Sequence, residues 1–178
     1  MSRSGDFKVK NIALIGFMGT GKTVVAKELA KRLKLRYVST DALIEEHEGL
    51  PITDIFSKKG EPYFRDVESG VARDVANESG VVVDAGGGII LRDENVSALK
   101  RNCVLICLTA APDKIIERTK GHRHRPLLNV ADPKARVEEL LKLRAPFYAK
   151  ADHQIDTSNI PISAVVDKIL KVIKNDSV

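Results

Sequence analysis

The sequence contains no tryptophan, and aromatic residues make up only 4% of its 178 residues. Proteins that bind single-stranded nucleic acid use aromatic side chains as platforms on which bases stack, so this scarcity argues against such a function. The chain is mildly basic, with a formal net charge of +5 and a pI near 9.2. A basic excess of this size equally suits the binding of a small anionic ligand.

Long apolar runs are also absent from the sequence. The longest unbroken run covers residues 103–108, far fewer than the roughly 20 residues of a membrane-spanning helix. Residues 1–10 lack the apolar core and the small-residue cleavage site of a secretory signal. These observations lead us to expect a cytoplasmic protein.

Cysteine is scarce, with only Cys103 and Cys107 in the chain. On a strand this spacing places them on one face and roughly 13 Å apart, too far for a disulfide. The four histidines and two cysteines show no zinc-ligand spacing, which excludes a structural zinc site.

Short apolar runs alternate with amphipathic segments along the chain. This alternation predicts an α/β fold whose parallel sheet is covered by helices on both faces. Strands are expected at 11–16, 37–38, 81–84, 103–108 and 153–156. Helices are expected at 22–33, from Thr40 or Asp41 to His47, and at 52–59, 62–79, 93–100, 112–119, 132–145 and 161–174. The length and the lack of repeats or linkers predict a single domain over residues 1–178.

Residues 16–23, Gly-Phe-Met-Gly-Thr-Gly-Lys-Thr, match the P-loop pattern between a predicted strand and a predicted helix. In this motif backbone N–H groups surround a phosphate at the helix N-terminus. We expect Lys22 to supply positive charge to the β- and γ-phosphates and the Thr23 hydroxyl to ligate Mg²⁺. The alternative is a glycine-rich turn with an incidental lysine, against which the flanking elements argue.

Two aspartates follow predicted strands, at the edge where open α/β sheets bind ligands. Asp84 ends the run 81–84 and resembles a Walker-B acid, which would hold Mg²⁺ beside Thr23. Asp41 can accept a proton from a substrate hydroxyl as that oxygen attacks phosphorus. The alternatives are a solvated strand end for Asp84 and a helix cap for Asp41.

Glycines and arginines supply further candidates for ligand contact. Gly86, Gly87 and Gly88 permit close backbone approach to a ligand and expose N–H donors, although a flexible loop is the alternative. Arg65 and Arg144 would bind a substrate carboxylate if well aimed, and otherwise are ordinary surface arginines.

A strongly basic segment follows the helix predicted at 112–119. Residues 118–131 contain Arg118, Lys120, Arg123 and Arg125, two histidines and no Asp or Glu. We expect a mobile loop near 120–131 that closes over bound phosphates and excludes water, with an arginine neutralising charge in the transition state. The alternative is a solvated basic loop.

Six segments, taken together, resemble the shikimate kinase family. They are the P-loop at 16–23, Ser39-Thr-Asp41, Phe64-Arg65, Gly86-Gly-Gly88, Arg125-Pro-Leu-Leu128 and Arg144-Ala-Pro-Phe-Tyr148. Many nucleotide-binding proteins share the P-loop, whereas the combination is specific to this family. The resemblance covers about residues 10–170.

The resemblance implies a nucleoside-monophosphate-kinase-like fold, a three-layer α/β/α P-loop domain with a five-stranded parallel sheet. It implies transfer of the γ-phosphate of ATP, with Mg²⁺, to the 3-hydroxyl of shikimate in aromatic amino-acid biosynthesis. The helices at about 41–80 would bind the substrate, and residues 120–131 would form the lid.

Site residues follow by position from the resemblance. Those implied to bind ATP are Gly19, Thr20, Gly21, Lys22, Thr23, Val24, Arg118 and Arg125. Those implied to bind shikimate are Asp41, Arg65, Gly87, Gly88 and Arg144. Lys22, Asp41 and Arg125 would be catalytic, with Arg118 stacked near adenine and Arg125 reaching the phosphates from the lid.

The sequence departs from the family pattern in two places. Family members usually carry Asp-x-Asp after the second strand, where Ser39 takes the first position, and a Ser or Thr where Asp84 precedes the glycines. We hypothesise that Asp84 replaces the missing carboxylate in organising Mg²⁺, which assigns the metal to Thr23 and Asp84. Residues 156–161 also lack the basic residue that often follows Asp-Thr, which leaves the adenine-side contacts there open.

Three alternative functions are weighed against this interpretation. A P-loop kinase for another carboxylated polyol is compatible with Ser39, and both Arg65 and Arg144 still favour an acidic substrate. A non-catalytic nucleotide-binding homologue would not need Lys22 and Asp41 intact. Nucleic-acid binding through the basic loop predicts a steep salt dependence and ranks last. We expect a monomer.

Overall fold

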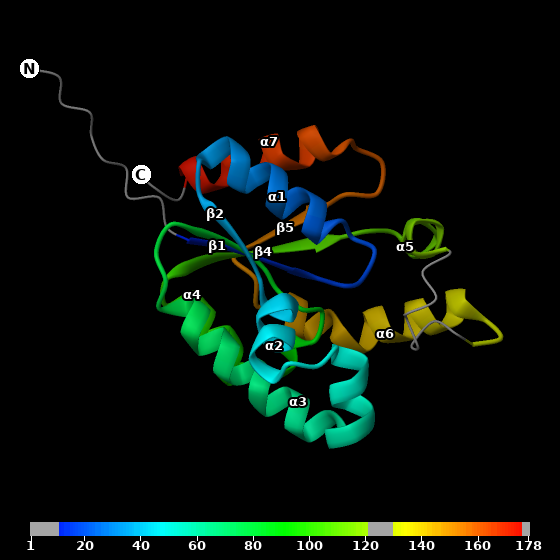
Figure 1. Cartoon of the computed structure of the whole chain (residues 1–178). Helices are drawn as coiled ribbons and strands as arrows, with labels where there is room; N and C mark the ends of the chain where they lie inside the picture. The colour runs from blue at the N-terminus through cyan, green and yellow to red at the C-terminus, as the bar shows by residue number, and fades with distance from the viewer. Residues whose placement is uncertain (1–10, 121–129, 176–178) are drawn as a thin grey trace, which may run out of the picture.

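Five parallel strands form the central sheet of the protein, whose structure, a computed structural model, describes residues 11–120 and 130–175. The strands lie in the spatial order β2, β3, β1, β4, β5 (Figure 1). Their bounds are β1 (Asn11–Gly16), β2 (Arg36–Ser39), β3 (Val81–Asp84), β4 (Cys103–Thr109) and β5 (His153–Asp156). Every neighbouring pair is parallel, as the sequence predicts.

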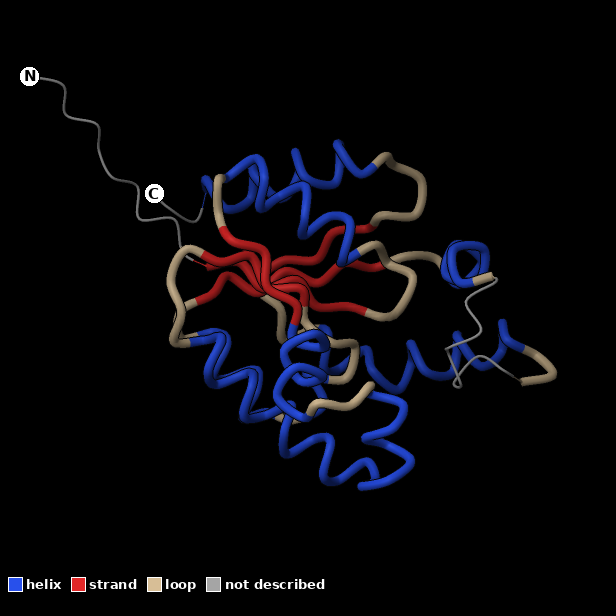
Figure 2. Tube along the Cα trace, viewed as in Figure 1, coloured by secondary structure: helices blue, strands red, loops and turns tan. Residues whose placement is uncertain are grey.

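Helices lie on both faces of this sheet (Figure 2). Those described are α1 (Lys22–Leu33), α2 (Thr40–Glu48), α3 (Ile52–Ala76), α4 (Asp93–Lys100), α5 (Pro112–Thr119), α6 (Pro133–Tyr148) and α7 (Ile162–Asn175), with a 3₁₀ helix at Ile89–Leu91. The helices α1 and α7 cover one face, and α2, α3, α4 and α6 lie on the other (Figure 1). The predicted three-layer α/β/α fold with a five-stranded parallel sheet is confirmed.

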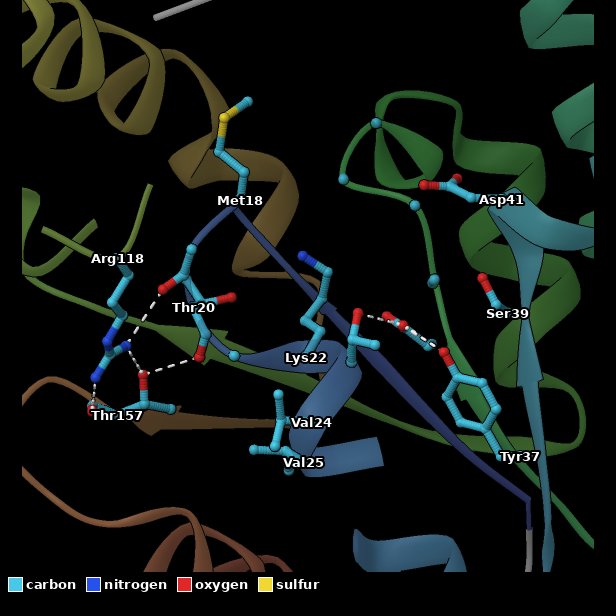
Figure 3. Close-up of a pocket in the computed structure, with 18 of the residues that line it drawn as sticks. Met18, Thr20, Lys22, Val24, Val25, Tyr37, Ser39, Asp41, Arg118 and Thr157 are labelled. Carbon is cyan, nitrogen blue, oxygen red and sulfur yellow. Dashed lines mark hydrogen bonds between the residues drawn. The ribbon is translucent and has the colours of Figure 1, made fainter. Parts of the chain in front are cut away.

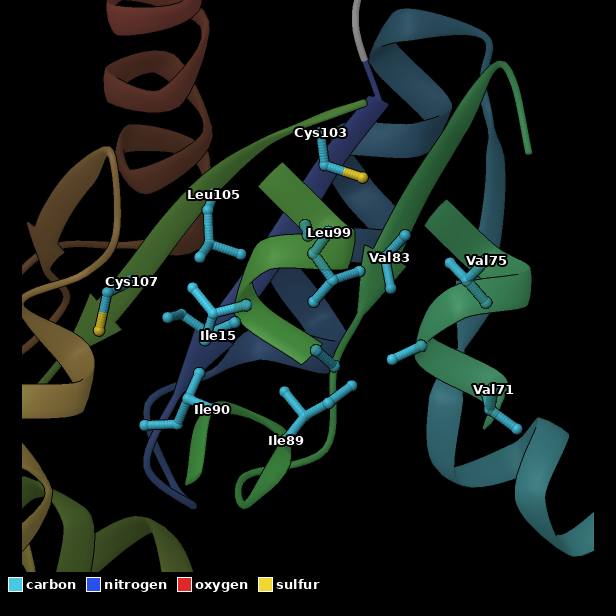
Figure 4. Close-up of a cluster of buried hydrophobic side chains, with 14 of the residues drawn as sticks. Ile15, Val71, Val75, Val83, Ile89, Ile90, Leu99, Cys103, Leu105 and Cys107 are labelled. Carbon is cyan, nitrogen blue, oxygen red and sulfur yellow. The ribbon is translucent and has the colours of Figure 1, made fainter. Parts of the chain in front are cut away.

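The alternation of side chains along each strand divides the core into two layers. In β1, Ile12 and Leu14 belong to the cluster with residues of α1 and α7. Ala13 and Ile15 belong to the cluster with residues of α3, α4 and α6, part of which Figure 4 shows. Because successive strand side chains point to opposite faces, an entirely apolar strand serves both layers.

The predicted break within residues 52–79 is a kink inside one helix, α3. Gly60 adopts φ 83° and ψ 167°, a conformation that only glycine reaches easily, and Pro62 begins the next turn. The two predicted helices are therefore joined across this kink. The predicted end near 79 is wrong, because the helix ends at Ala76 and Asn77 caps it.

The ends of two other helices differ from expectation. Ser39, rather than Thr40 or Asp41, caps α2, since its Oγ accepts a hydrogen bond from the Ala42 N–H at 3.3 Å. Asp41 is thus left available to the cleft described below. The helix α6 continues to Tyr148, past residue 145, where the sequence predicts its end.

The prediction that Cys103 and Cys107 form no disulfide is confirmed. Cys103 and Cys107 are both buried and free, in the same layer of the core, and form no disulfide. In the part of the chain that the structure describes, every helix is too short or too polar to cross a bilayer.

Candidate active site

A cleft of about 810 Å³ lies at the carboxyl ends of β2 and β3, beside the P-loop (Figure 3). Every predicted site residue that the structure describes lines this cleft: Gly19, Thr20, Gly21, Lys22, Thr23, Val24, Asp41, Arg65, Asp84, Gly87, Gly88, Arg118 and Arg144. Arg125 and most of the predicted lid, 120–131, lie outside the described residues. The sequence motifs thus converge on one cavity.

The P-loop joins β1 to α1 and is held by its own hydrogen bonds. Lys22 Nζ donates to the carbonyl oxygens of Gly16 at 2.8 Å and Phe17 at 3.0 Å. Thr20 Oγ1 donates to the same Phe17 carbonyl at 2.7 Å. These bonds fix the curl of the loop and keep the ammonium group of Lys22 within it.

The first turn of α1 faces the cleft without a side-chain cap. Its N-cap is Gly21, whose φ is 92°, and no side chain accepts a hydrogen bond there. The first N–H groups of a helix require acceptors and carry partial positive charge. This end of the cleft is therefore suited to a phosphate group.

Asp84, at the end of β3, binds two hydroxyl groups with one carboxylate oxygen. Thr23 Oγ1 donates to Asp84 Oδ2 at 2.7 Å, and the phenol of Tyr37 donates to the same oxygen at 3.0 Å. The carboxylate is 8% exposed. The structure thus brings Thr23 and Asp84 together, as their positions at the same sheet edge predict.

Asp41 lies in the first turn of α2. Figure 3 shows it, with Ser39, on the opposite side of Lys22 from Arg118 and Thr157. The surrounding protein reduces the solvation of this carboxylate and raises its pKa, the negative charge of Asp84 raises the pKa further, and Lys22 opposes both. A carboxylate with a raised pKa is a better proton acceptor, which suits contact with a substrate hydroxyl.

The glycines at 86 and 88 leave room for charged side chains. A Cβ atom on Gly86 would lie 2.5 Å from Asp41 Oδ1, and one on Gly88 would lie 2.3 Å from Arg65 Nη1. The Gly86 N–H also donates to Thr40 Oγ1 at 2.8 Å. The glycines therefore allow Asp41 and Arg65 to approach the backbone that follows β3.

Arg65 extends from α3 into the cleft and is bound by two glutamates. Its Nη1 donates to Glu68 Oε2 at 2.7 Å, and its Nε and Nη2 donate to Glu61 Oε1 at 3.2 and 3.0 Å. Glu68 is 1% exposed, whereas the Glu61 side chain is 60% exposed. Burial raises the pKa of Glu68, and the hydrogen bond from Arg65 lowers it.

Arg144 reaches the same region from α6. Its Nη1 donates to the Gly87 carbonyl oxygen at 3.3 Å, and its guanidinium carbon lies 5.4 Å from the centre of the Phe17 ring. Two guanidinium groups from different helices, Arg65 and Arg144, thus border residues 86–88, the glycine segment. Such a pair suits a carboxylate ligand.

Arg118, at the end of α5, fastens the P-loop to the segment after β5. Its Nη1 donates to the Gly19 carbonyl oxygen at 3.3 Å and to Thr157 Oγ1 at 3.0 Å, and its Nη2 donates to the Thr157 carbonyl oxygen at 2.7 Å. The edge of the guanidinium is therefore occupied by protein acceptors. Its flat face is the part that the implied stacking on adenine would use.

The residues around Thr23 fit magnesium rather than a metal held by protein alone. Among the described residues, no group of three or more His, Cys, Asp or Glu side chains is placed to hold a metal ion. Mg²⁺ at phosphate sites takes one or two protein oxygens and completes its shell with water and phosphate. The Thr23 hydroxyl and the Asp84 carboxylate satisfy that requirement.

Three polar residues that line the cleft are not predicted by the sequence patterns: Tyr37, Glu68 and Thr157. Glu68 follows Arg65 at the i, i+3 spacing of helix neighbours, which is a usable signal. Tyr37 alternates with Ser39 along a strand and so shares its face. Thr157 offers no comparable pattern, because its contacts join loops distant in sequence.

Sequence comparison shows close relatives over nearly the whole chain. The family model described as shikimate kinase matches residues 18–174. A shikimate kinase of Thermodesulfovibrio yellowstonii is 47% identical over 163 residues, covering 92% of this chain and 94% of that protein. A shikimate kinase of Pelotomaculum thermopropionicum is 43% identical over 166 residues, covering 93% and 96%.

Structural comparison agrees with these relatives. A shikimate kinase from Acinetobacter baumannii in complex with shikimate superposes with a TM-score of 0.89 at 34% identity, covering 96% of both chains. A gluconokinase from Sinorhizobium meliloti superposes with a TM-score of 0.60 at only 17% identity, which shows a shared fold alone. The chain belongs to the shikimate kinase family.

Proposed function

We propose that the cleft transfers the γ-phosphate of ATP to the 3-hydroxyl of shikimate, giving shikimate 3-phosphate and ADP. One observation carries this proposal: the P-loop, the Asp41 carboxylate and the two arginines Arg65 and Arg144 line the same cavity. The P-loop suits the phosphates, and Arg65 with Arg144 suits the substrate carboxylate. Family membership supports the same reaction.

The nucleotide end of the cleft is formed by the P-loop. The backbone from Gly19 to Val24 would surround the phosphates at the start of α1, and Lys22 would neutralise their charge. Arg118 would lie against the base, and Arg125 would reach the transferred phosphoryl group from the lid. Positioning and charge neutralisation are the main demands of phosphoryl transfer.

The acceptor end is formed by α2, α3, α6 and the glycine segment. Asp41 would accept a hydrogen bond from the shikimate 3-hydroxyl and either orient that oxygen or remove its proton. Arg65 and Arg144 would bind the carboxylate of shikimate, with Gly87 and Gly88 as backbone contacts. The raised pKa of Asp41 supports its role as proton acceptor.

We assign Mg²⁺ to Thr23 and Asp84. The bound ion supplies positive charge that offsets the charge on the phosphates. The hydrogen bond from Thr23 to Asp84 uses the only proton of that hydroxyl, so its lone pairs stay available to a cation. Asp84→Asn should therefore raise the magnesium concentration that activity requires.

The proposal also covers the oligomeric state and the location of the protein. We propose that the protein is a monomer, because its 178 residues are expected to form a single small domain. We also propose that it is located in the cytoplasm, as the sequence leads us to expect. Light scattering coupled to gel filtration measures the mass directly, and a dimer mass would contradict the first part.

The decisive experiment measures ADP release from magnesium-ATP with and without shikimate. We expect turnover that depends on shikimate and is lost in Lys22→Ala, because the Lys22 ammonium group is held within the P-loop, where it would neutralise the phosphates. Arg36→Ala is the matched control, since that arginine pairs with Glu78 away from the cleft. Turnover with another carboxylated polyol in place of shikimate, or nucleotide binding without turnover, would replace this proposal by one of the alternatives above.

A further inference from the structure

Tyr37 is a cleft residue that the proposed reaction leaves without a role. It projects from β2 and donates its phenol hydrogen bond to Asp84 Oδ2 at 3.0 Å. Thr23 donates to that same oxygen at 2.7 Å. One carboxylate oxygen thus joins a strand residue to a residue of the P-loop helix.

The two hydrogen bonds occupy both lone pairs of one Asp84 carboxylate oxygen. A carboxylate oxygen has two lone pairs in the carboxylate plane, so Thr23 and Tyr37 together saturate Oδ2. Within residues 11–120 and 130–175, no hydrogen bond reaches Oδ1. The carboxylate is therefore held in one rotation, with Oδ1 as its available ligand atom.

The sheet holds the phenol rigidly in this position. Ser39 pairs with Asp84 and Tyr37 pairs with Val82 in the parallel register, so Tyr37 and Asp84 belong to the same sheet face. The Tyr37 ring packs on the apolar layer under α1, and Lys27 Nζ lies 5.4 Å from the ring centre. Only the phenol oxygen, at the far end of the ring, reaches the carboxylate.

We propose that Tyr37 is a positioning residue for the divalent metal site, fixing the Asp84 carboxylate through Oδ2 so that Oδ1 serves the cation. The inference rests on the metal role proposed above for Asp84. This role for Tyr37 also explains how Asp84, on β3, can act as a metal ligand in this chain, in which Ser39 stands at the β2 position where family members usually carry an aspartate. Substitution of a residue that orients a ligating carboxylate commonly lowers metal affinity by about 10- to 100-fold.

The test compares Tyr37→Phe with Tyr63→Phe, which removes a phenol hydroxyl bonded to Glu48 on the surface of α3. The probe is Mn²⁺ in the presence of ADP, with free Mn²⁺ measured by electron paramagnetic resonance. We expect the Mn²⁺ Kd of Tyr37→Phe to rise by about 10-fold or more, with Tyr63→Phe within twofold of the parent. ADP binding measured in EDTA should be equal in all three proteins.

A second readout separates positioning from damage to the fold. Activity of Tyr37→Phe should require more magnesium while kcat at saturating magnesium recovers to near the parent value. A lower kcat at every magnesium concentration, with an unchanged Mn²⁺ Kd, overturns the inference. So does an Mn²⁺ Kd that falls, because a carboxylate freed from the phenol would then be the better ligand.

Asp84→Asn distinguishes failure of this inference from failure of the metal assignment. If Asp84→Asn weakens Mn²⁺ binding and Tyr37→Phe does not, the role of Tyr37 is wrong and that of Asp84 stands. If neither variant changes the Mn²⁺ Kd, both assignments are wrong. If both weaken it, the double variant should bind Mn²⁺ no worse than Asp84→Asn alone, since Tyr37 acts through that carboxylate.

Discussion

At the scale of single residues, the acceptor end of the cleft depends on how Arg65 is held. Its two glutamate partners differ in burial, since Glu68 is 1% exposed and the Glu61 side chain is 60% exposed. A surface ion pair contributes little, whereas a buried hydrogen bond between charged groups fixes its partners. Glu68 rather than Glu61 therefore determines where the guanidinium points.

We predict that Glu68→Gln raises the KM for shikimate by about 10-fold or more, because hydrogen bonds to charged groups contribute about 1.5–3 kcal/mol. The KM for ATP should change little, since the P-loop does not contact Glu68. Steady-state kinetics with each substrate varied provide the measurement. Glu61→Gln is the control and should leave both constants near the parent values; equal effects of the two substitutions would contradict the argument.

Residue patterns predicted most of the polar residues that line the cleft, and the exceptions have a physical cause. The P-loop, Asp41, Asp84 and the arginines were recognisable because each lies at a strand end or within a spaced motif. Glu68 could have been predicted as a cleft residue from its i, i+3 spacing to Arg65 on the same helix. The sharing of Asp84 Oδ2 by Thr23 and Tyr37 was not predictable, because it requires β2 to lie directly beside β3.

At the scale of elements, α3 contains two glycines with opposite roles. Gly60 has φ 83° and ψ 167° and makes the kink between Ile52 and Ala76. Gly70 is helical, and a Cβ atom added to it would meet nothing within 4 Å. The same substitution at these two positions therefore tests the backbone directly.

We predict that Gly60→Ala lowers the free energy of unfolding by about 1–3 kcal/mol, since this backbone region is nearly restricted to glycine. Gly70→Ala should raise it by about 0.5–1 kcal/mol through its higher helix propensity. Urea denaturation followed by circular dichroism measures both. Stabilisation by Gly60→Ala would mean that the kink is not required by the fold.

Element types were predictable from periodicity, but several helix ends were not. The predicted end of the helix at 132–145 is wrong, because α6 continues to Tyr148, whose buried side chain packs in the core. The end of α3 at Ala76 likewise precedes Gly80, the glycine that suggested its boundary. At the end of α6, burial of Tyr148 outweighs the local signal.

At the scale of the whole molecule, the sheet and its covering helices isolate both thiols from solvent. Cys103 and Cys107 are 4% and 0% exposed. Burial raises the pKa of Cys103 to about 11, and it raises that of Cys107 to about 12, with Lys22 opposing the latter shift. At pH 8 both groups are therefore protonated in the folded protein, and the thiolate that reacts forms only as the pH approaches those values.

We predict that both thiols react with Ellman's reagent at pH 8 at least about 100-fold more slowly in the folded protein than in guanidinium chloride. The thiolate fraction alone gives this factor for a pKa two units higher, and burial slows the reaction further. Absorbance at 412 nm follows the reaction. Equal rates with and without denaturant would contradict the burial of these side chains.

Because both native cysteines are buried, a single cysteine introduced at the surface could be labelled selectively with a spectroscopic probe. Val130, at 44% exposure, lies near the end of the basic segment 118–131. In Val130→Cys the new thiol would be the one accessible to a maleimide dye or a nitroxide, with the native pair left unmodified in the core. Nucleotide-dependent changes within the predicted lid, 120–131, could then be recorded without first removing a native cysteine.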